Sequence, residues 1–228
     1  MIKSIVILSA AAAIGCGIAA SSASKPDTNP NVNLAAFAPT PAKAAETKPG
    51  ELQTAVFAGG CFWGIEAVFD HVKGVTEAKS GFAGGKIKNP SYDQVSDGDT
   101  GHAESVKVTF DPSTVTYEQL LAVFFSSHDP TELNYQGPDH GTQYRSAVFY
   151  QNDDQKKAAT DYIASLNSAK AFSKPIVTEV SALNAFYEAE AYHQHYLEKN
   201  PSDPYIVYND LPKLENLKNK FPDLYVGK

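Results

Sequence analysis

The chain of 228 residues is poor in cysteine, methionine and arginine, and these shortages exclude several classes of protein. Its two cysteines, Cys16 and Cys61, are too few for a disulfide scaffold of the small secreted kind or for a cysteine-rich zinc module. Arg145 is the only arginine, and 26 Asp and Glu against 19 Lys and Arg give a formal net charge of −7. Because an acidic chain has few cations to neutralise a phosphate backbone, we expect no nucleic-acid partner.

The composition that remains is that of an ordinary globular protein, with 43% apolar and 20% charged residues. This balance excludes a disordered chain, and the length is sufficient for one domain with a sizeable core. We place the folded domain at residues 51–228. The only methionine is Met1, so we expect the exported form to contain no methionine.

Residues 1–23 have the pattern of an export signal, with the apolar run Ile5–Ile14 followed by small residues suited to cleavage. The run is shorter than the roughly 20 apolar residues that a membrane span needs. A second interpretation stays open, because the residues up to Cys16 resemble a bacterial lipoprotein box, in which this cysteine carries lipid; an uncleaved anchor helix is a third. Residues 24–50, rich in Pro, Ala, Asn and Thr, predict an extended, mobile linker. We therefore expect an exported protein that is periplasmic or lipid-anchored to the cell envelope.

Apolar periodicity predicts alternating strands and helices in the folded domain. Strands are expected at residues 54–57, 75–82, 105–111, 144–150 and 175–181, and helices at 61–73, from 116 past 124, at 152–167, at 187–199 and around 211–220. The core order β-α-β-β-α-β is that of the split βαβ, or ferredoxin-like, pattern. We therefore expect an α/β (α+β) fold with this core, additional helices and a strand, and a long C-terminal tail.

Local signals support these elements. From Ile65 onward the first helix is apolar at the spacing i, i+3, i+4 and i+7, which gives it one apolar face. The stretch Ser105–Asp111 alternates apolar and polar residues, as a half-buried strand does. Capping boxes open two later helices, at Thr116 with Gln119 and at Asn152 with Gln155.

Cys61 is the candidate nucleophile, because it lies at a turn between the first strand and the first helix. Unpaired backbone N–H groups and the positive end of the helix dipole favour a thiolate there. The competing interpretation is a buried, inert thiol. Phe62 and Trp63 precede the apolar helix face and are available to line a pocket. Since Cys16 is cut away or lipidated, an oxidised Cys61 is expected to stop at sulfenic acid and to need an external thiol.

Four polar residues in the predicted loops and at their edges are candidates for acid chemistry. Glu104 ends a polar loop at the mouth of a strand, where desolvation would raise its pKa and let it donate a proton near neutrality. The competing interpretation is a solvated carboxylate. Asp139 lies in a turn signal, and Tyr92 and Tyr144 are hydrogen-bond donors that are each equally consistent with simple packing.

The histidines predict no metal site. His193 and His195 are two residues apart on a predicted helix, so they diverge by about 200° and cannot share one ion. The other histidines are scattered along the chain. A cysteine hydrolase would need a histidine base beside Cys61, and the sequence leaves His102 and His140 open for that role.

Five motifs together resemble one known family, the peptide methionine sulfoxide reductases of the A type. They are Gly60-Cys61-Phe62-Trp63-Gly64, Asn89-Pro90-Ser91-Tyr92, Gly98-Asp99-Thr100-Gly101-His102-Ala103-Glu104, His128-Asp129-Pro130 and Asp139-His140-Gly141-Thr142-Gln143-Tyr144-Arg145-Ser146. The resemblance extends over roughly residues 53–225.

The resemblance implies an oxidoreductase that reduces the S-epimer of methionine sulfoxide, free or in proteins, and so repairs oxidative damage. Cys61 would attack the sulfur, and Phe62 and Trp63 would bury the substrate methyl group. Glu104 would protonate the departing oxygen. The chemistry needs this pairing, because a sulfoxide oxygen leaves poorly until it is protonated, so a neutral carboxylic acid must face a thiolate.

The resemblance also assigns the remaining candidates. Tyr92 and Tyr144 would hydrogen-bond the sulfoxide oxygen, and Asp139 would belong to the same polar cluster. No cofactor is expected to be bound. Family members often carry recycling cysteines near the C-terminus, whereas residues 200–205 contain none. We therefore expect a monomeric enzyme whose sulfenic acid is reduced by an external thiol protein such as thioredoxin or glutaredoxin, and whose substrates are oxidised proteins or peptides.

Two other functions use the same residues. A thiol peroxidase would consume hydrogen peroxide and ignore methyl sulfoxides. A non-enzymatic module would bind oxidised or methionine-rich peptides and would keep its function without the Cys61 thiol. The sulfoxide reductase and the thiol peroxidase both require that the Cys61 sulfur be ionised and accessible, whereas the binding module does not.

Overall fold

The computed structural model describes residues 34–37 and 51–227. The predicted export signal and Cys16 lie outside the described residues, as does most of the predicted linker. The exception is the 3-10 turn η1 (Leu34–Phe37), where the expectation of a mobile linker is wrong. Leu34 is only 2% exposed, and its carbonyl accepts a hydrogen bond of 2.8 Å from the hydroxyl of Tyr162. An apolar side chain with a satisfied carbonyl can be buried at little cost, so these residues dock on the body.

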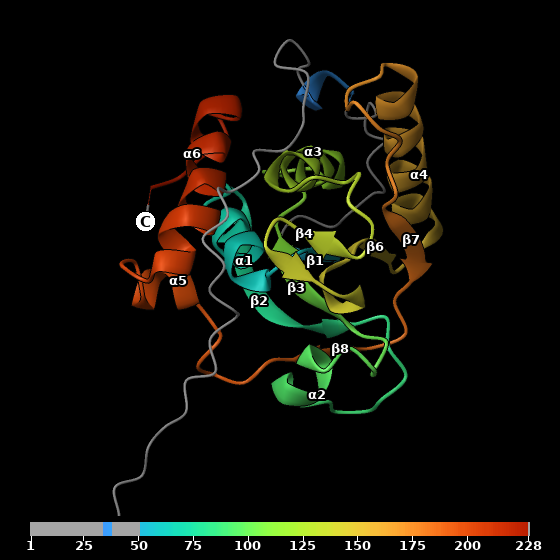
Figure 1. The fold of residues 1–228 in the computed structure, drawn as a ribbon. Coiled ribbons are helices and arrows are strands. Elements are labelled where there is room, and N and C mark those ends of the chain that lie inside the picture. The colour runs from blue at the N-terminus through green and yellow to red at the C-terminus, as the bar shows by residue number, and fades with distance from the viewer. Residues whose placement is uncertain (1–33, 38–50, 228) are drawn as a thin grey trace, which may run out of the picture.

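A six-stranded sheet forms the centre of the molecule, with strand order β7-β6-β1-β3-β2-β8 (Figure 1). Its strands are β1 (Gln53–Gly59), β2 (Val75–Ala83), β3 (Ala103–Phe110), β6 (Ser146–Tyr150), β7 (Glu179–Ala182) and β8 (Phe186–Glu188). The four central strands pair antiparallel in the order β6-β1-β3-β2. This arrangement confirms the ferredoxin-like split βαβ core. Two strands extend it, since β7 adds parallel to β6 and β8 adds antiparallel to β2.

Helices α1 (Phe62–Asp70) and α3 (Tyr117–Ser127) cover one face of the sheet and enclose the larger hydrophobic core with it. A smaller apolar cluster lies on the other face. The remaining elements are α2 (Tyr92–Ser96), the hairpin β4 (Tyr135–Gln136) and β5 (Asp139–His140), the 3-10 turn η2 (Thr142–Tyr144), α4 (Asp153–Ser168), α5 (Tyr196–Lys199), the π-helix η3 (Ile206–Asp210) and α6 (Leu211–Lys220). None of the helices among the described residues has the length and apolar character that crossing a bilayer requires.

The two helix starts predicted from capping residues, at Thr116 and Asn152, are confirmed. Thr116 and Gln119 form the reciprocal capping box, each side chain accepting a backbone N–H of the other residue. Asn152 accepts the N–H of Gln155 at 2.8 Å, but Gln155 accepts the N–H of Gln151 instead of returning the bond to Asn152. The polar loop after β2 contains the short helix α2, which the sequence analysis missed although a capping box opens it.

The second half of the chain departs most from expectation. The helix expected at residues 187–199 is wrong over most of its length, because Phe186–Glu188 pairs with β2 as β8 and only Tyr196–Lys199 is helical. Aromatic residues that pair with a free sheet edge override a weak helical pattern. The strand expected at 175–181 begins at Glu179. The C-terminal tail is not a loose extension, since η3 and α6 return to pack on α1 (Figure 1).

Candidate active site

The antiparallel sheet brings the main candidate residues together where β1 ends and β3 and β6 begin. In the register, Phe57 of β1 pairs with Val106 of β3, and Gly59 pairs with Ser146 of β6. The end of β1 therefore meets the beginnings of β3 and β6. Cys61 follows β1 by two residues, Glu104 is the second residue of β3, and Tyr144 lies two residues before β6.

The turn into α1 depends on a glycine. Gly60 has a φ of +90°, which side chains disfavour, and a Cβ there would lie 2.6 Å from Cγ of Gln136. This turn makes Cys61 the N-cap residue of α1. The residue exposes only 2% of its surface, so the thiol that the enzymatic interpretation requires to be accessible is largely enclosed. A sulfur so enclosed can be reached only by a slender group.

Glu104 lies directly beside the nucleophile. Its Oε2 accepts a hydrogen bond of 3.0 Å from the backbone N–H of Phe62, the residue that follows Cys61. The glutamate is 1% exposed, and burial raises its pKa to about 8, with the N–H of Phe62 opposing the shift and Asp139 adding to it. The carboxyl is therefore mostly protonated at neutral pH. This confirms the expected pKa shift and excludes the solvated carboxylate.

Aromatic rings surround the first turn of α1. Phe62 lies 6.3 Å from Tyr92, centroid to centroid, and 5.1 Å from His193. The indole of Trp63 stacks on Tyr196 at 3.8 Å with an interplanar angle of 9°. The two rings predicted to form the cradle thus lie among residues from α2 and from the C-terminal part of the chain.

His193 is a site residue that the sequence analysis missed. The indole N–H of Trp63 donates to its Nδ1 at 3.1 Å, so Nε2 carries the proton of the neutral ring. Burial lowers the pKa of His193 to about 4, which keeps the ring neutral. Its buried Nε2 has no hydrogen-bond partner within the described part of the chain. The assumption that His193 shares a helix with His195 concealed it, because α5 begins only at Tyr196.

Asp139 and Tyr205 form a second polar contact near the thiol. The Tyr205 hydroxyl donates to Oδ2 of Asp139, and its ring meets Trp63 edge-on at 5.9 Å. Burial raises the pKa of Asp139 above its usual range, and the bond from Tyr205 partly offsets the shift. Burial also raises the pKa of Tyr205, with the charge of Cys61 as the next cause. Tyr205 was not predicted, because its proximity depends on the path of the tail.

A buried ion pair from the tail completes the arrangement. Asp210, at the end of η3, is 0% exposed and accepts a 2.9 Å bond from the ammonium of Lys213 on α6. The pair packs on Gly64 in the first turn of α1, where a Cβ would lie 2.8 Å from Nζ of Lys213 and closer still to the Asp210 carboxylate. The glycine that ends the Cys61 motif is therefore needed for close approach of the tail.

The side chains of His102 and His128 have structural roles. Nδ1 of His102 accepts the N–H of Gly85, and its Nε2 contacts the carbonyl of Ile87 at 2.8 Å. His128 contacts the carbonyl of Phe124 and the hydroxyl of Ser146, and burial lowers its pKa to about 4. Neither imidazole is free to act as a base for the thiol.

His140 has a ring contact of its own, stacking on Tyr135 at 5.4 Å. Because it is exposed on the β4–β5 hairpin, it is not built into the buried site. A cysteine hydrolase, which needs an imidazole against the sulfur, finds no support in these three positions.

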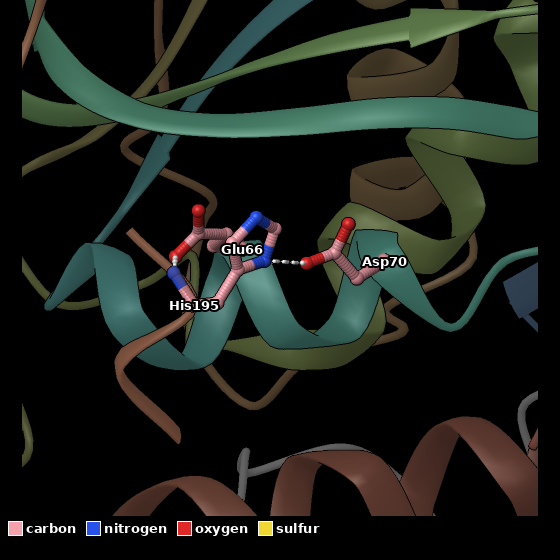
Figure 2. A group of neighbouring side chains, drawn as sticks. All are labelled: Glu66, Asp70 and His195. Atoms are coloured by element: carbon pink, nitrogen blue, oxygen red, sulfur yellow. Dashed lines mark hydrogen bonds and ion pairs between the residues drawn. The ribbon is translucent and has the colours of Figure 1, made fainter. Parts of the chain in front are cut away.

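A group with metal-ligand chemistry, Glu66, Asp70 and His195, lies one turn further along α1 (Figure 2). His195 bridges the two carboxylates, with its backbone N–H on Oε2 of Glu66 and its Nδ1 on Oδ2 of Asp70, both at 2.9 Å. Burial raises the pKa of Glu66 to about 7. The expectation of no metal site rested on the histidines alone and did not consider these carboxylates. These contacts hold His195, the N-cap residue of α5, against α1, so we assign the cluster a structural role.

Comparison with known proteins places this arrangement in context. A family model described as peptide methionine sulfoxide reductase matches residues 53–224. The chain is 58% identical over 181 residues to a peptide methionine sulfoxide reductase of Mesorhizobium japonicum, covering 79% of this chain and 92% of that protein. It is 50% identical over 173 residues to the enzyme of Pasteurella multocida, covering 76% and 98%.

Solved structures agree. Mxr1 from Saccharomyces cerevisiae in reduced form is 35% identical with a TM-score of 0.62, covering 71% of this chain and 92% of that one. Methionine sulfoxide reductase A of Corynebacterium diphtheriae is 33% identical with a TM-score of 0.61, covering 82% and 92%.

Proposed function

The chain belongs to the peptide methionine sulfoxide reductase family, and from this premise we propose how its site performs the reaction. The protein is an oxidoreductase, a peptide-methionine (S)-S-oxide reductase that repairs oxidised protein. One observation carries the assignment of roles. The buried, largely protonated Glu104 accepts its hydrogen bond from the residue next to Cys61, so a proton donor and a nucleophile share one desolvated place.

In the first step the thiolate of Cys61 attacks the sulfoxide sulfur while Glu104 delivers its proton to the oxygen. The attack forms a bond between Sγ of Cys61 and the substrate sulfur. That bond and the S–O bond then break as the hydroxyl group passes to Sγ, which leaves Cys61 as a sulfenic acid and releases the substrate as methionine. The sulfoxide gains two electrons and the cysteine loses two. An acid whose pKa lies near 8 is suited to this step, because it is both protonated at neutral pH and able to give up its proton.

The rings set which group enters. Phe62 and Trp63, 1% and 8% exposed, offer an apolar surface that buries the methyl group of the substrate. Tyr92 lies against Phe62, and Tyr144 lies at the same sheet edge with 7% exposure. Their hydroxyls are assigned to the sulfoxide oxygen. Asp139, held by Tyr205, is assigned to orienting this polar side of the site.

Regeneration needs an external thiol, because Cys61 is the only cysteine in the part of the chain that the structure describes. A thiol of the reductant attacks the sulfenic acid and releases water, and a second thiol then resolves the mixed disulfide. A dithiol protein of the thioredoxin or glutaredoxin class fits this need. No bound cofactor enters any of these steps.

The N-terminal pattern supports export of the domain at residues 51–228. We place the protein in the periplasm, or on the cell envelope if Cys16 carries lipid. Mass spectrometry of the exported form distinguishes the two, because lipidation adds acyl mass to Cys16 and simple cleavage near residue 23 removes it. The monomeric state, tested by light scattering, stays a prediction.

The activity is tested with both epimers of a methyl sulfoxide and a small thiol reductant. We expect the S-epimer alone to be consumed, and the Cys61→Ser variant to show no turnover. Rapid consumption of hydrogen peroxide with no sulfoxide reduction would favour a thiol peroxidase, and full function in the serine variant would favour a binding module. After turnover without reductant, a sulfenic acid probe should label Cys61; an intrachain disulfide would contradict external recycling.

A further inference from the structure

The ion pair of Asp210 and Lys213 has a position that packing alone does not explain. The side chain of Asp210 is fully buried and that of Lys213 is 16% exposed. Moving two charges out of water is costly, and their mutual attraction often fails to offset that cost. One oxygen of Asp210, Oδ2, is also buried without a hydrogen-bond partner among the described residues. If the pair served only to pack η3 and α6 on α1, apolar side chains could take its place without loss of stability.

The location of the pair indicates a different role. Lys213 places its ammonium against the first helical turn that Cys61 caps, at the point where Gly64 has no side chain. The charge of a Cys61 thiolate acts on Lys213 directly, as does that of Asp139. Burial lowers the pKa of Lys213, but these anions and Asp210 outweigh it, so the lysine stays protonated. A permanent cation thus lies within electrostatic reach of the nucleophile.

Charged and titratable groups from several elements share this space. They are Glu104 on β3, Asp139 on β5, Tyr205 before η3, Asp210 at the end of η3 and His128 after α3. The carboxyl groups and the phenol are either neutral or negatively charged, and a negative charge disfavours a thiolate nearby. The buried histidine is neutral near pH 7. Lys213 therefore supplies the positive charge in a group that is otherwise acidic.

We propose that Asp210 and Lys213 are positioning residues for the nucleophile: Asp210 holds the ammonium of Lys213 beside the first turn of α1, where its charge favours the thiolate form of Cys61. The two charges act in opposite directions on the sulfur, Lys213 for the anion and Asp210 against it. This role rests on Cys61 being the nucleophile of the proposed function. The proposed role would let the C-terminal segment η3–α6 act on the nucleophile through charge, without a recycling cysteine.

The test measures the pH dependence with which iodoacetamide alkylates Cys61 in the full-length protein. Mass spectrometry of the Cys61 peptide separates this reaction from that of Cys16. Lys213→Met should move the midpoint of the profile to higher pH by about one unit, because the thiolate loses a nearby cation. Asp210→Asn keeps an oxygen for Lys213 but removes the opposing charge, so its midpoint should move to lower pH by a smaller amount, because the thiolate interacts directly with Lys213.

Two further variants sharpen the result. The double variant Asp210→Asn with Lys213→Met removes both charges and should have a midpoint between those of the wild type and Lys213→Met, because the thiolate interacts more strongly with Lys213 than with Asp210. Lys218→Met makes the same chemical change at an exposed position of α6 and should leave the profile unchanged. If Lys213→Met does not fold, Lys213→Gln retains a donor for Asp210 without the charge and should show the same upward shift.

A purely structural pair would give a different pattern. Loss of packing would leave all midpoints unchanged or shift both single variants in the same direction, and either result would overturn the inference. Alkylation does not depend on turnover, so failure here is distinguishable from failure of the proposed function. If Cys61→Ser retains sulfoxide reduction, the proposed function is wrong, whatever the alkylation profiles show.

Discussion

The split βαβ core and the C-terminal segment after β7 contribute unequal kinds of residue to the same site. The core supplies the reacting residues, Cys61 and Glu104, which the paired strands β1 and β3 hold at neighbouring strand ends. The C-terminal segment supplies the surroundings, with Tyr196 and Tyr205 against Trp63 and the charged pair against Gly64. Reactivity thus depends on backbone pairing within the core, whereas the environment depends on side-chain packing between distant segments.

The largest effect is expected in the core, from Glu104→Gln. This variant should lower kcat by about 10²- to 10³-fold, because it removes the proton donor and keeps the shape. Since burial raises the pKa of Glu104 to about 8, the wild-type rate should fall as pH rises above about 8. The fall should be absent in the variant's residual activity.

Stability provides the control for Glu104→Gln. The folded state favours the neutral acid, so its contribution to the free energy of unfolding is fully present below the ordinary pKa of glutamate and is lost as pH rises through about 8. Glutamine cannot ionise, so the variant should be at least as stable as the wild type at pH 9 in urea unfolding. A marked loss of stability there would mean that lost activity reflects misfolding.

Gly64→Ala tests the contact between the two regions. Helix propensity alone would stabilise the variant by up to about 1 kcal/mol. A Cβ at this position meets the Asp210–Lys213 pair, so we expect a loss of about 2 kcal/mol in the free energy of unfolding. Gly227→Ala, where nothing lies within 4 Å, is the matched control. A stabilised Gly64→Ala protein would show that the tail does not pack tightly on α1.

Tyr205→Phe tests the polar contribution of the tail. It removes the hydroxyl that donates to the buried carboxylate of Asp139, and a buried acceptor left unpaired costs about 1–3 kcal/mol. We expect kcat/KM to fall about tenfold in a steady-state assay. Tyr208→Phe makes the same change at a residue that is 66% exposed and should have no effect. Equal activity of both variants would show that the Tyr205–Asp139 hydrogen bond does not contribute to catalysis.

The smallest effect is expected from the aromatic stacking on Trp63. Tyr196→Leu removes a ring stacked at 3.8 Å, an interaction that contributes about 0.5–1.5 kcal/mol. KM for a peptide sulfoxide should rise about three- to tenfold while kcat changes little. Tyr196→Phe keeps the ring and should resemble the wild type. If both variants raise KM equally, the hydroxyl and not the stacking matters.

The same division explains how far the sequence could predict the molecule. The core and its reactive pair follow from local signals, such as the alternation of Ser105–Asp111 and the glycine turn before Cys61. The short helix α2 was also within reach, because Ser91 and Gln94 form a capping box. Nothing local indicated that residues 186–188 would pair with β2, and that error misplaced His193.

The charged pair was beyond prediction for a physical reason. Asp210 and Lys213 look like solvated charges on a short helical patch, and only the return of the tail onto α1 buries them. Burial of this kind depends on long-range packing, which periodicity does not report. The 2% exposure of Cys61 could not be predicted either, because burial depends on the packing of the whole domain.

The turn at Leu34 has a consequence for where the folded domain begins. Its side chain is buried in the core, the turn η1 contacts α3 and α4, and the hydroxyl of Tyr162 on α4 donates a hydrogen bond to the Leu34 carbonyl. The core therefore includes a side chain from outside residues 51–228, and a protein trimmed to those residues would leave the apolar surface under Leu34 uncovered.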